Sequence, residues 1–96
     1  MKLSEYYEMY LTLHQNTTNR RLHVVGQIAT ILFILWAAFS QHYLMLVLSP
    51  FIVYPFAWTG HFFFEKNKPA AFSNPIYAKI SDWIMLKDII TGKIKW

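Results

Sequence analysis

The chain contains no cysteine and carries little charge. Without cysteine it has no disulfides and no thiolate ligands, so a bound metal would need nitrogen or oxygen donors. Charged residues make up 15% of its 96 residues, whereas a soluble domain carries roughly 25%. Apolar residues make up 55%. This composition predicts that lipid, rather than water, surrounds much of the molecule.

The missing charge is concentrated in one stretch. No Asp, Glu, Lys or Arg occurs in the 43 residues from Leu22 to Phe64. A helix needs about 20 apolar residues to cross a hydrocarbon core roughly 30 Å thick, so this stretch has room for two crossings and a turn. A short polar run interrupts it, consisting of Ser40, Gln41 and His42. We therefore expect an antiparallel hairpin of transmembrane helices at about 22–39 and 43–64. Pro50 and Pro55 each remove a backbone donor and predict a kink or loosened segment in the second helix.

Two shorter amphipathic segments flank the predicted hairpin. Apolar residues recur at helical spacing near the start, namely Leu3, Tyr6, Tyr7, Tyr10 and Leu11, and predict a helix over 4–14 whose stripe lies on the membrane surface. The turn-forming residues 16–19 end this helix and cap the next. A second stripe comprises Ile76, Ile80, Trp83, Ile84 and Ile90, which predicts a surface-lying helix of about 15 residues. The predicted fold class is an all-α membrane protein, a single domain over 1–96 with interfacial helices at both ends.

Basic residues flank the apolar stretch on both sides and are absent from its central turn. Lys2, Arg20 and Arg21 precede the stretch, and six lysines follow it. The positive-inside rule then places both termini in the cytoplasm, as for a multi-pass protein of the inner membrane if the source is bacterial. The net charge of +4 does not indicate a nucleic-acid partner, because these cations form no dense patch interleaved with aromatic residues.

Two histidines lie equally far from the predicted turn. His23 is 18 residues before Gln41, and His61 is 18 residues after Tyr43. At about 1.5 Å per residue both lie roughly 27 Å from the turn, level with each other near the cytoplasmic interface. The turn at 16–19 can fold His14 back towards His23. We predict that His14, His23 and His61 converge, and that His42 faces solvent at the opposite end.

The residues around this cluster suit a metal. Glu65 lies four residues after His61 and can either ligate the metal or orient the imidazole, and Trp58, one turn before His61, can wall the site. Imidazoles and carboxylates without thiolates suit non-haem iron, zinc, copper or nickel, and the spacing does not choose among them. Two alternatives stand beside a metal enzyme. One is a non-catalytic membrane module whose histidines are structural or bind lipid headgroups, and the other is a bis-histidine haem protein.

The blocks that contain these histidines resemble the Mpo-like family, in its short bacterial form. The similar segments are HQNTTNRRLHVVG at 14–26 and AWTGHFFFEKNKPA at 57–70, followed by Pro75 and Asp82. The resemblance covers nearly the whole chain. It implies that His14, His23 and His61 are ligands of Fe(II), and that Glu65, Asn67 and Asp82 support catalysis.

Fungal relatives in that family are Fe(II)-dependent dioxygenases that oxidise 2-hydroxy fatty acids to aldehydes one carbon shorter. The resemblance therefore implies alpha-oxidation of a long-chain 2-hydroxy fatty acid by O₂. Such a substrate would lay its tail among the apolar helices, and Arg20 or Arg21 could pair with its carboxylate. Two spans alone enclose little of a reactive site, so we expect a homo-oligomer.

Overall fold

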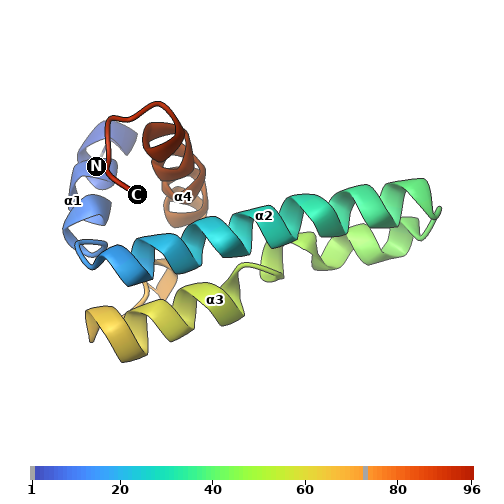
Figure 1. The fold of residues 1–96 in the computed structure, drawn as a ribbon, viewed down its shortest axis with the longest axis horizontal. Coiled ribbons are helices and arrows are strands. Elements are labelled where there is room, and N and C mark those ends of the chain that lie inside the picture. Colours follow the sequence, from blue (N-terminus) through green and yellow to red (C-terminus); the bar gives the residue numbers. More distant parts are fainter. Residues whose placement is uncertain (1, 73) are drawn as a thin grey trace.

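In the computed structural model, which describes residues 2–72 and 74–96, every regular element is helical (Figure 1). The α-helices are α1 (Leu3–Thr12), α2 (Thr17–Phe39), α3 (Tyr54–Thr59) and α4 (Pro75–Ile90). The tighter or wider helical segments are η1 (Tyr43–Phe51), η2 (Gly60–Glu65) and η3 (Ala70–Phe72). The prediction of an all-α chain is confirmed.

The long helix α2 has a defined beginning and end. The side chain of Asn16 accepts a hydrogen bond from the backbone N–H of Asn19 and caps the first turn. At the other end Gln41 takes a left-handed conformation with φ of 63°, and the chain reverses and returns alongside α2 (Figure 1). His42 is exposed at this reversal, as predicted.

The returning arm is not one regular helix. It begins as the 3₁₀ segment η1, which contains Pro50, and restarts as α3 with Pro55 in its first turn. The interruption thus falls where the two prolines predict it. The arm ends in η2, a widened π-helical turn. By length and composition, two helical stretches are apolar enough to cross a membrane. One is α2, and the other is the whole returning arm, Tyr43–Glu65.

The two arms approach closely at two glycines. A Cβ added to Gly26 would lie 2.9 Å from Val53 Cγ2, and one added to Gly60 would collide with the Asn19 side chain and lie 3.2 Å from Asn19 Cα. Real Cβ atoms do not lie as close to other atoms as a Cβ at Gly26 would lie to Val53, or one at Gly60 to the Asn19 side chain. Both positions therefore require glycine. The contact at Gly60 fixes the end of the second arm against the start of α2.

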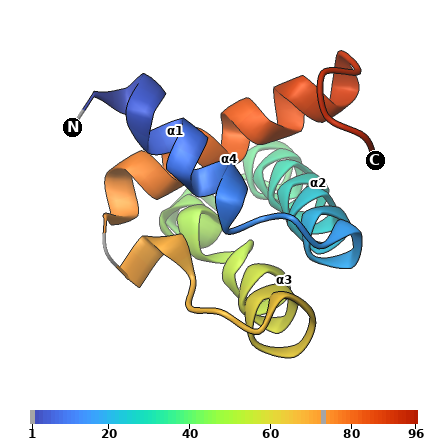
Figure 2. The same cartoon turned by 90° about the vertical axis from the view of Figure 1, so that its left-hand side faces the viewer.

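Helices α1 and α4 pack on each other across the end of the hairpin that carries the chain termini (Figure 2). Their shared core contains Tyr6, Tyr10, Ala70, Ala78 and Met85. Tyr6 and Tyr10 are only 3% and 2% exposed, so the prediction that the tyrosine stripe lies on the membrane surface is wrong. The stripe meets α4 instead, because α4 offers a face of small side chains against which the rings can pack.

Helix α4 is apolar on its outer face. Its buried residues are Ala78, Ser81, Asp82, Met85 and Asp88. The stripe expected to face the membrane stays uncovered, and Ile76 and Ile90 are 71% and 75% exposed. The inner face of α4 therefore mixes polar groups with Ala78 and Met85, while the isoleucine stripe faces outward, as it would not in a helix packed in water.

Candidate metal centre

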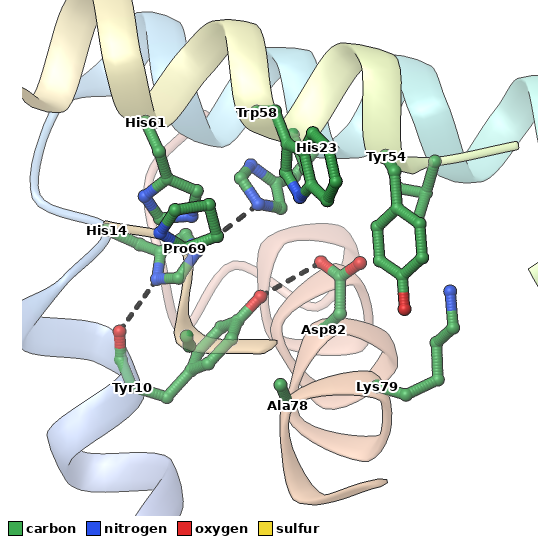
Figure 3. A pocket seen from close by; sticks show the side chains of 13 residues that line it. Tyr10, His14, His23, Tyr54, Trp58, His61, Pro69, Ala78, Lys79 and Asp82 are labelled. Atoms are coloured by element: carbon green, nitrogen blue, oxygen red, sulfur yellow. Dashed lines mark hydrogen bonds between the residues drawn. The ribbon is translucent and has the colours of Figure 1, made fainter. Parts of the chain in front are cut away.

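Three imidazoles meet between the ends of the two arms and the helices α1 and α4 (Figure 3). His14 follows α1, His23 lies in the second turn of α2 and His61 is the second residue of the π-helical turn η2. Their ring centroids are 4.5–5.0 Å apart and their planes are nearly perpendicular, at 81–88°. All three are at most 3% exposed. The contact between His23 and His61 agrees with the equal arm lengths counted from the sequence.

Each ring is held through its Nδ1 atom. His14 donates to the Tyr10 carbonyl at 2.7 Å, and His23 donates to the Asn19 carbonyl at 2.9 Å. A carbonyl only accepts, so in both rings Nδ1 carries the proton and Nε2 presents a lone pair. Each acceptor lies four residues before its histidine, one helical turn away. This geometry aims the two Nε2 atoms away from the backbone and towards each other.

His61 is fixed by Asn67. The Asn67 amide nitrogen donates to the Leu13 carbonyl at 3.0 Å, which turns its oxygen towards His61 Nδ1 at 2.7 Å. The His61 ring must therefore donate from Nδ1 as well. The widened turn η2 and a left-handed Lys66, with φ of 59°, bring Asn67 back to this position. π-Helical turns of this kind are common at functional sites.

The facing nitrogens fit a cation. His14 Nε2 and His23 Nε2 are 3.2 Å apart, although both are acceptors, so two lone pairs oppose each other unless a positive charge lies between them. Two nitrogens bound to one ion at about 2.1 Å are separated by roughly 3.0–3.4 Å. One ligand atom from each of the three histidines lies within 4.8 Å of the others. The cluster could hold a metal ion.

Protonation of His14 does not compete strongly with the binding of a metal. Burial, together with the neighbouring His23, lowers the pKa of His14 to about 2. Neutral imidazole is the form that binds a metal. The arrangement does not suit haem, because the rings contact one another edge to face and leave no space for a porphyrin between any pair.

Tyr10 and Asp82 form a second layer over the histidines. The Tyr10 ring stacks on His14 with centroids 3.9 Å apart, and its hydroxyl donates to Asp82 Oδ1 at 3.1 Å. Burial raises the pKa of Asp82 to about 7, although the Tyr10 hydrogen bond and Lys79 act to lower it. Sequence reasoning assigned Tyr10 to the membrane surface. Its place four residues before His14, on the same helical face, was the signal that could have located it.

Glu65 does not contact His61 through its side chain. Its Oε1 accepts from the backbone N–H of Asn16 at 2.8 Å and from Asn19 Nδ2 at 3.1 Å. The hydrogen bonds of Glu65 therefore run to the start of α2, and its expected role beside His61 stays a prediction. Glu65 thus ties the second arm to the helix that carries His23.

The two arginines lie outside the cavity beside the histidines. Arg20 donates to the carbonyls of His14 and Gln15, both at 3.1 Å. The guanidinium of Arg21 lies 5.3 Å from the Trp96 ring and donates to the Trp96 carbonyl. Neither lines the cavity. The structure therefore gives no support to an arginine as the partner of a substrate carboxylate, and Arg20 instead fastens the segment that carries His14.

A small cavity of roughly 30 Å³ opens beside the histidines. Tyr54 and Trp58 form an aromatic wall, and Lys79 and Asp82 of α4 lie on the other side (Figure 3). Trp58 thus lies where its position before His61 predicts. Lys79 is the one cation among the lining residues that the structure describes. Sequence reasoning missed it, because on α4 it reads as an ordinary polar residue beside an apolar stripe.

The chain was compared with known proteins. A family model described as 2-hydroxy-palmitic acid dioxygenase Mpo1-like matches residues 1–94. No curated protein and no solved structure matches.

Proposed function

The chain belongs to the Mpo1-like family, and from this premise we propose that it is a membrane-bound, Fe(II)-dependent dioxygenase of long-chain 2-hydroxy fatty acids, producing an aldehyde one carbon shorter. One observation carries the proposal. Three buried histidines donate from Nδ1 to fixed acceptors and turn their Nε2 atoms towards one point. Three neutral imidazoles in a site of this kind suit Fe(II), which supplies the reactivity towards O₂.

The proposed roles of the residues follow from their contacts. His14, His23 and His61 hold the metal, and Asn67 positions His61. Asp82 accepts a hydrogen bond from Tyr10 and interacts with the side chain of Gln27, and its carboxyl takes the proton of the substrate hydroxyl. A carboxyl with a pKa near 7 is suited to accept and return a proton at neutral pH. Glu65 and Arg20 position the segments that carry the ligands.

The reaction needs a confined site. The bond between C1 and C2 breaks, C1 leaves as CO₂, C2 becomes the aldehyde carbon, and O₂ takes up the two electrons and two protons that this oxidation releases. Tyr54 and Trp58 cover one side of the cavity and limit the access of water to the reacting atoms. The cavity holds a carboxylate and hydroxyl head, whereas an acyl tail must extend beyond it.

The proposed setting is a membrane. Apolar side chains project from the hairpin, and Leu32, Phe39 and Leu44 are 61%, 84% and 88% exposed. Lipid satisfies such a surface, and the backbone within the helices is satisfied internally. We place the tip of the hairpin across the bilayer and the histidines near the cytoplasmic interface, with both termini cytoplasmic. A homo-oligomer would cover more of the hairpin.

Oxygen consumption tests the proposal. Protein purified without oxygen, loaded with Fe(II) and given a 2-hydroxy fatty acid should take up O₂ and release the shortened aldehyde. The His61→Ala variant should lose this activity. His42→Ala should keep it, because His42 is exposed at the far end of the hairpin. Absence of aldehyde from a fully iron-loaded sample across several chain lengths would refute the activity.

A non-catalytic module is the second candidate. It requires that the histidines bind no metal, so their role would be to hold α1, α2 and the second arm together. Measuring the bound metal distinguishes the dioxygenase from the non-catalytic module. Near-stoichiometric iron that disappears in the His23→Ala variant excludes the module, and unchanged metal content in that variant favours it.

A further inference from the structure

Lys79 occupies an unusual position for a lysine on an otherwise apolar helix. Its side chain is half-buried, and its ammonium donates to the Pro50 carbonyl and lies 4.8 Å from the Tyr54 ring. Figure 3 shows it across the cavity from the histidines, beyond Asp82. The lysine thus stands at one end of the cavity, with the histidines at the other.

A second hollow adjoins the cavity at the same lysine. This groove is lined by Thr30, Ile34, Ser49, Pro50, Lys79 and Trp83, so α2, η1 and α4 each contribute to it. Its volume is roughly 250 Å³. Ile34 and Trp83 are each 37% exposed and join the groove to the outward apolar surface of the hairpin and of α4. Lys79 is the residue that the cavity and the groove share.

The charges around Lys79 favour an external anion. In the part of the chain that the structure describes, Lys79 is the sole cation lining either hollow. The carboxyl of Asp82, one turn later on α4, also lines the cavity and its charge acts on Lys79, but it accepts a hydrogen bond from Tyr10 on the side of the histidines. A carbonyl and an aromatic face accommodate an ammonium without neutralising it. A carboxylate brought by a ligand would form a charge-assisted hydrogen bond there. The apolar groove beyond Lys79 matches the hydrocarbon chain that such a ligand would carry.

We propose that Lys79 binds the carboxylate of the lipid substrate, and that the groove between α2, η1 and α4 takes its acyl chain. The substrate then enters sideways from the bilayer, with C1 and C2 passing Lys79 into the histidine cavity while the tail remains in the groove. Lys79 selects free acids over esters and alcohols of the same length. The inference rests on the proposed function for its reaction, but the binding step can be measured without turnover.

Fluorescence quenching tests the binding step in metal-free protein. Trp36, Trp58 and Trp96 are replaced by Phe, which leaves Trp83 in the groove as the reporter. Hexadecanoic acid with a nitroxide at mid-chain should quench Trp83 saturably, and unlabelled acid should reverse the quenching. Lys79→Met should raise the dissociation constant at least tenfold, whereas Lys79→Arg should retain most of the affinity. Lys87→Met is the matched control, because Lys87 is an exposed lysine two turns later on α4.

Each binding result either supports or overturns the assignment of Lys79 to the substrate carboxylate. The nitroxide methyl ester should bind weakly and equally to the parent and to Lys79→Met. Equal binding of acid to the parent and to a folded Lys79→Met, or equal binding of acid and ester to the parent, would overturn the assignment. Displacement by a single-chain phosphate monoester as effective as displacement by the acid would overturn the carboxylate preference.

Failure of the lipid site at Lys79 can be distinguished from failure of the proposed dioxygenase reaction. Lys79-dependent binding without any aldehyde from iron-loaded protein would refute the dioxygenase and leave the lipid site. Aldehyde formation by Lys79→Met with an unchanged KM would refute the lipid site and leave the dioxygenase.

Discussion

At the end of the hairpin near the chain termini, the hydrogen-bonded residues His14, His23 and His61 are at most 3% exposed, whereas at the tip the apolar residues Phe39 and Leu44 are 84% and 88% exposed. One end therefore buries polar groups, and the other exposes apolar ones. Burying a polar group is costly unless it is hydrogen-bonded, so the first end depends on specific protein contacts. The tip depends on the surrounding solvent, and lipid is the solvent that suits it.

The contrast between the two ends also separates the residues proposed to bind the metal from those proposed to anchor the protein in the membrane. Three α-helices and η2 contribute to the buried polar end, and each candidate ligand there is fixed by a partner from one turn away or from another segment. The tip consists of α2 and η1 alone. Substitutions at the polar end should therefore change metal binding and stability together, and substitutions at the tip should change neither.

The largest expected effect at the polar end is a pH dependence from Asp82. Its pKa is raised to about 7 by burial, so between roughly pH 4 and 7 the folded protein retains a proton that the unfolded chain has lost. The free energy of unfolding should fall as pH rises through this window, by on the order of 4 kcal/mol, and level off above it. Denaturant titrations of metal-free protein in detergent should show this slope in the parent and not in Asp82→Asn. Equal slopes in the two proteins would contradict it.

Metal binding should stabilise the polar end and depend on its histidines alone. A metal present at a hundredfold excess over its dissociation constant raises the free energy of unfolding by about 2.7 kcal/mol. Thermal unfolding should show this gain in the parent and in His42→Ala, and should show none in His23→Ala. An equal gain in His23→Ala would place the metal elsewhere.

A smaller effect is expected at Asn67, which contacts the ligand His61 and not the metal. Asn67→Ala removes the acceptor for His61 Nδ1 and the donor to the Leu13 carbonyl, and should weaken metal binding about 10–100-fold. Asn67→Asp keeps an acceptor for the ring and should lose less. Thr18→Ala, at an exposed position on the first turn of α2, serves as control in the same equilibrium titration. Identical losses in the Ala and Asp variants would argue against a role in positioning the ring.

The smallest effect is expected at the tip. Leu44→Ala removes an exposed side chain, so the free energy of unfolding in detergent should change by less than about 0.5 kcal/mol. Metal affinity should stay at the parent value. A loss of metal binding in Leu44→Ala would show that the two ends are coupled and that the contrast between them is too simple.

The sequence alone determined the helical fold, the position of the turn, the break at the prolines and the three histidines. These features depend on hydropathy, periodicity and chain arithmetic, which are local properties. His23 and His61 come together because their arms are of equal length, and His14 joins them because a four-residue turn permits little else.

Only the tertiary structure decided which faces are covered and which side chains meet. The tyrosine stripe could face lipid or protein equally well by its pattern, and the presence of α4 resolved the choice. Glu65 accepts hydrogen bonds from Asn16 and Asn19, and Asn67 accepts one from His61. Lys79 and Asp82 reached the cavity because α4 crosses the end of the hairpin. The physical reason is that the free energy of such contacts comes from segments distant in sequence, whose approach no local pattern records.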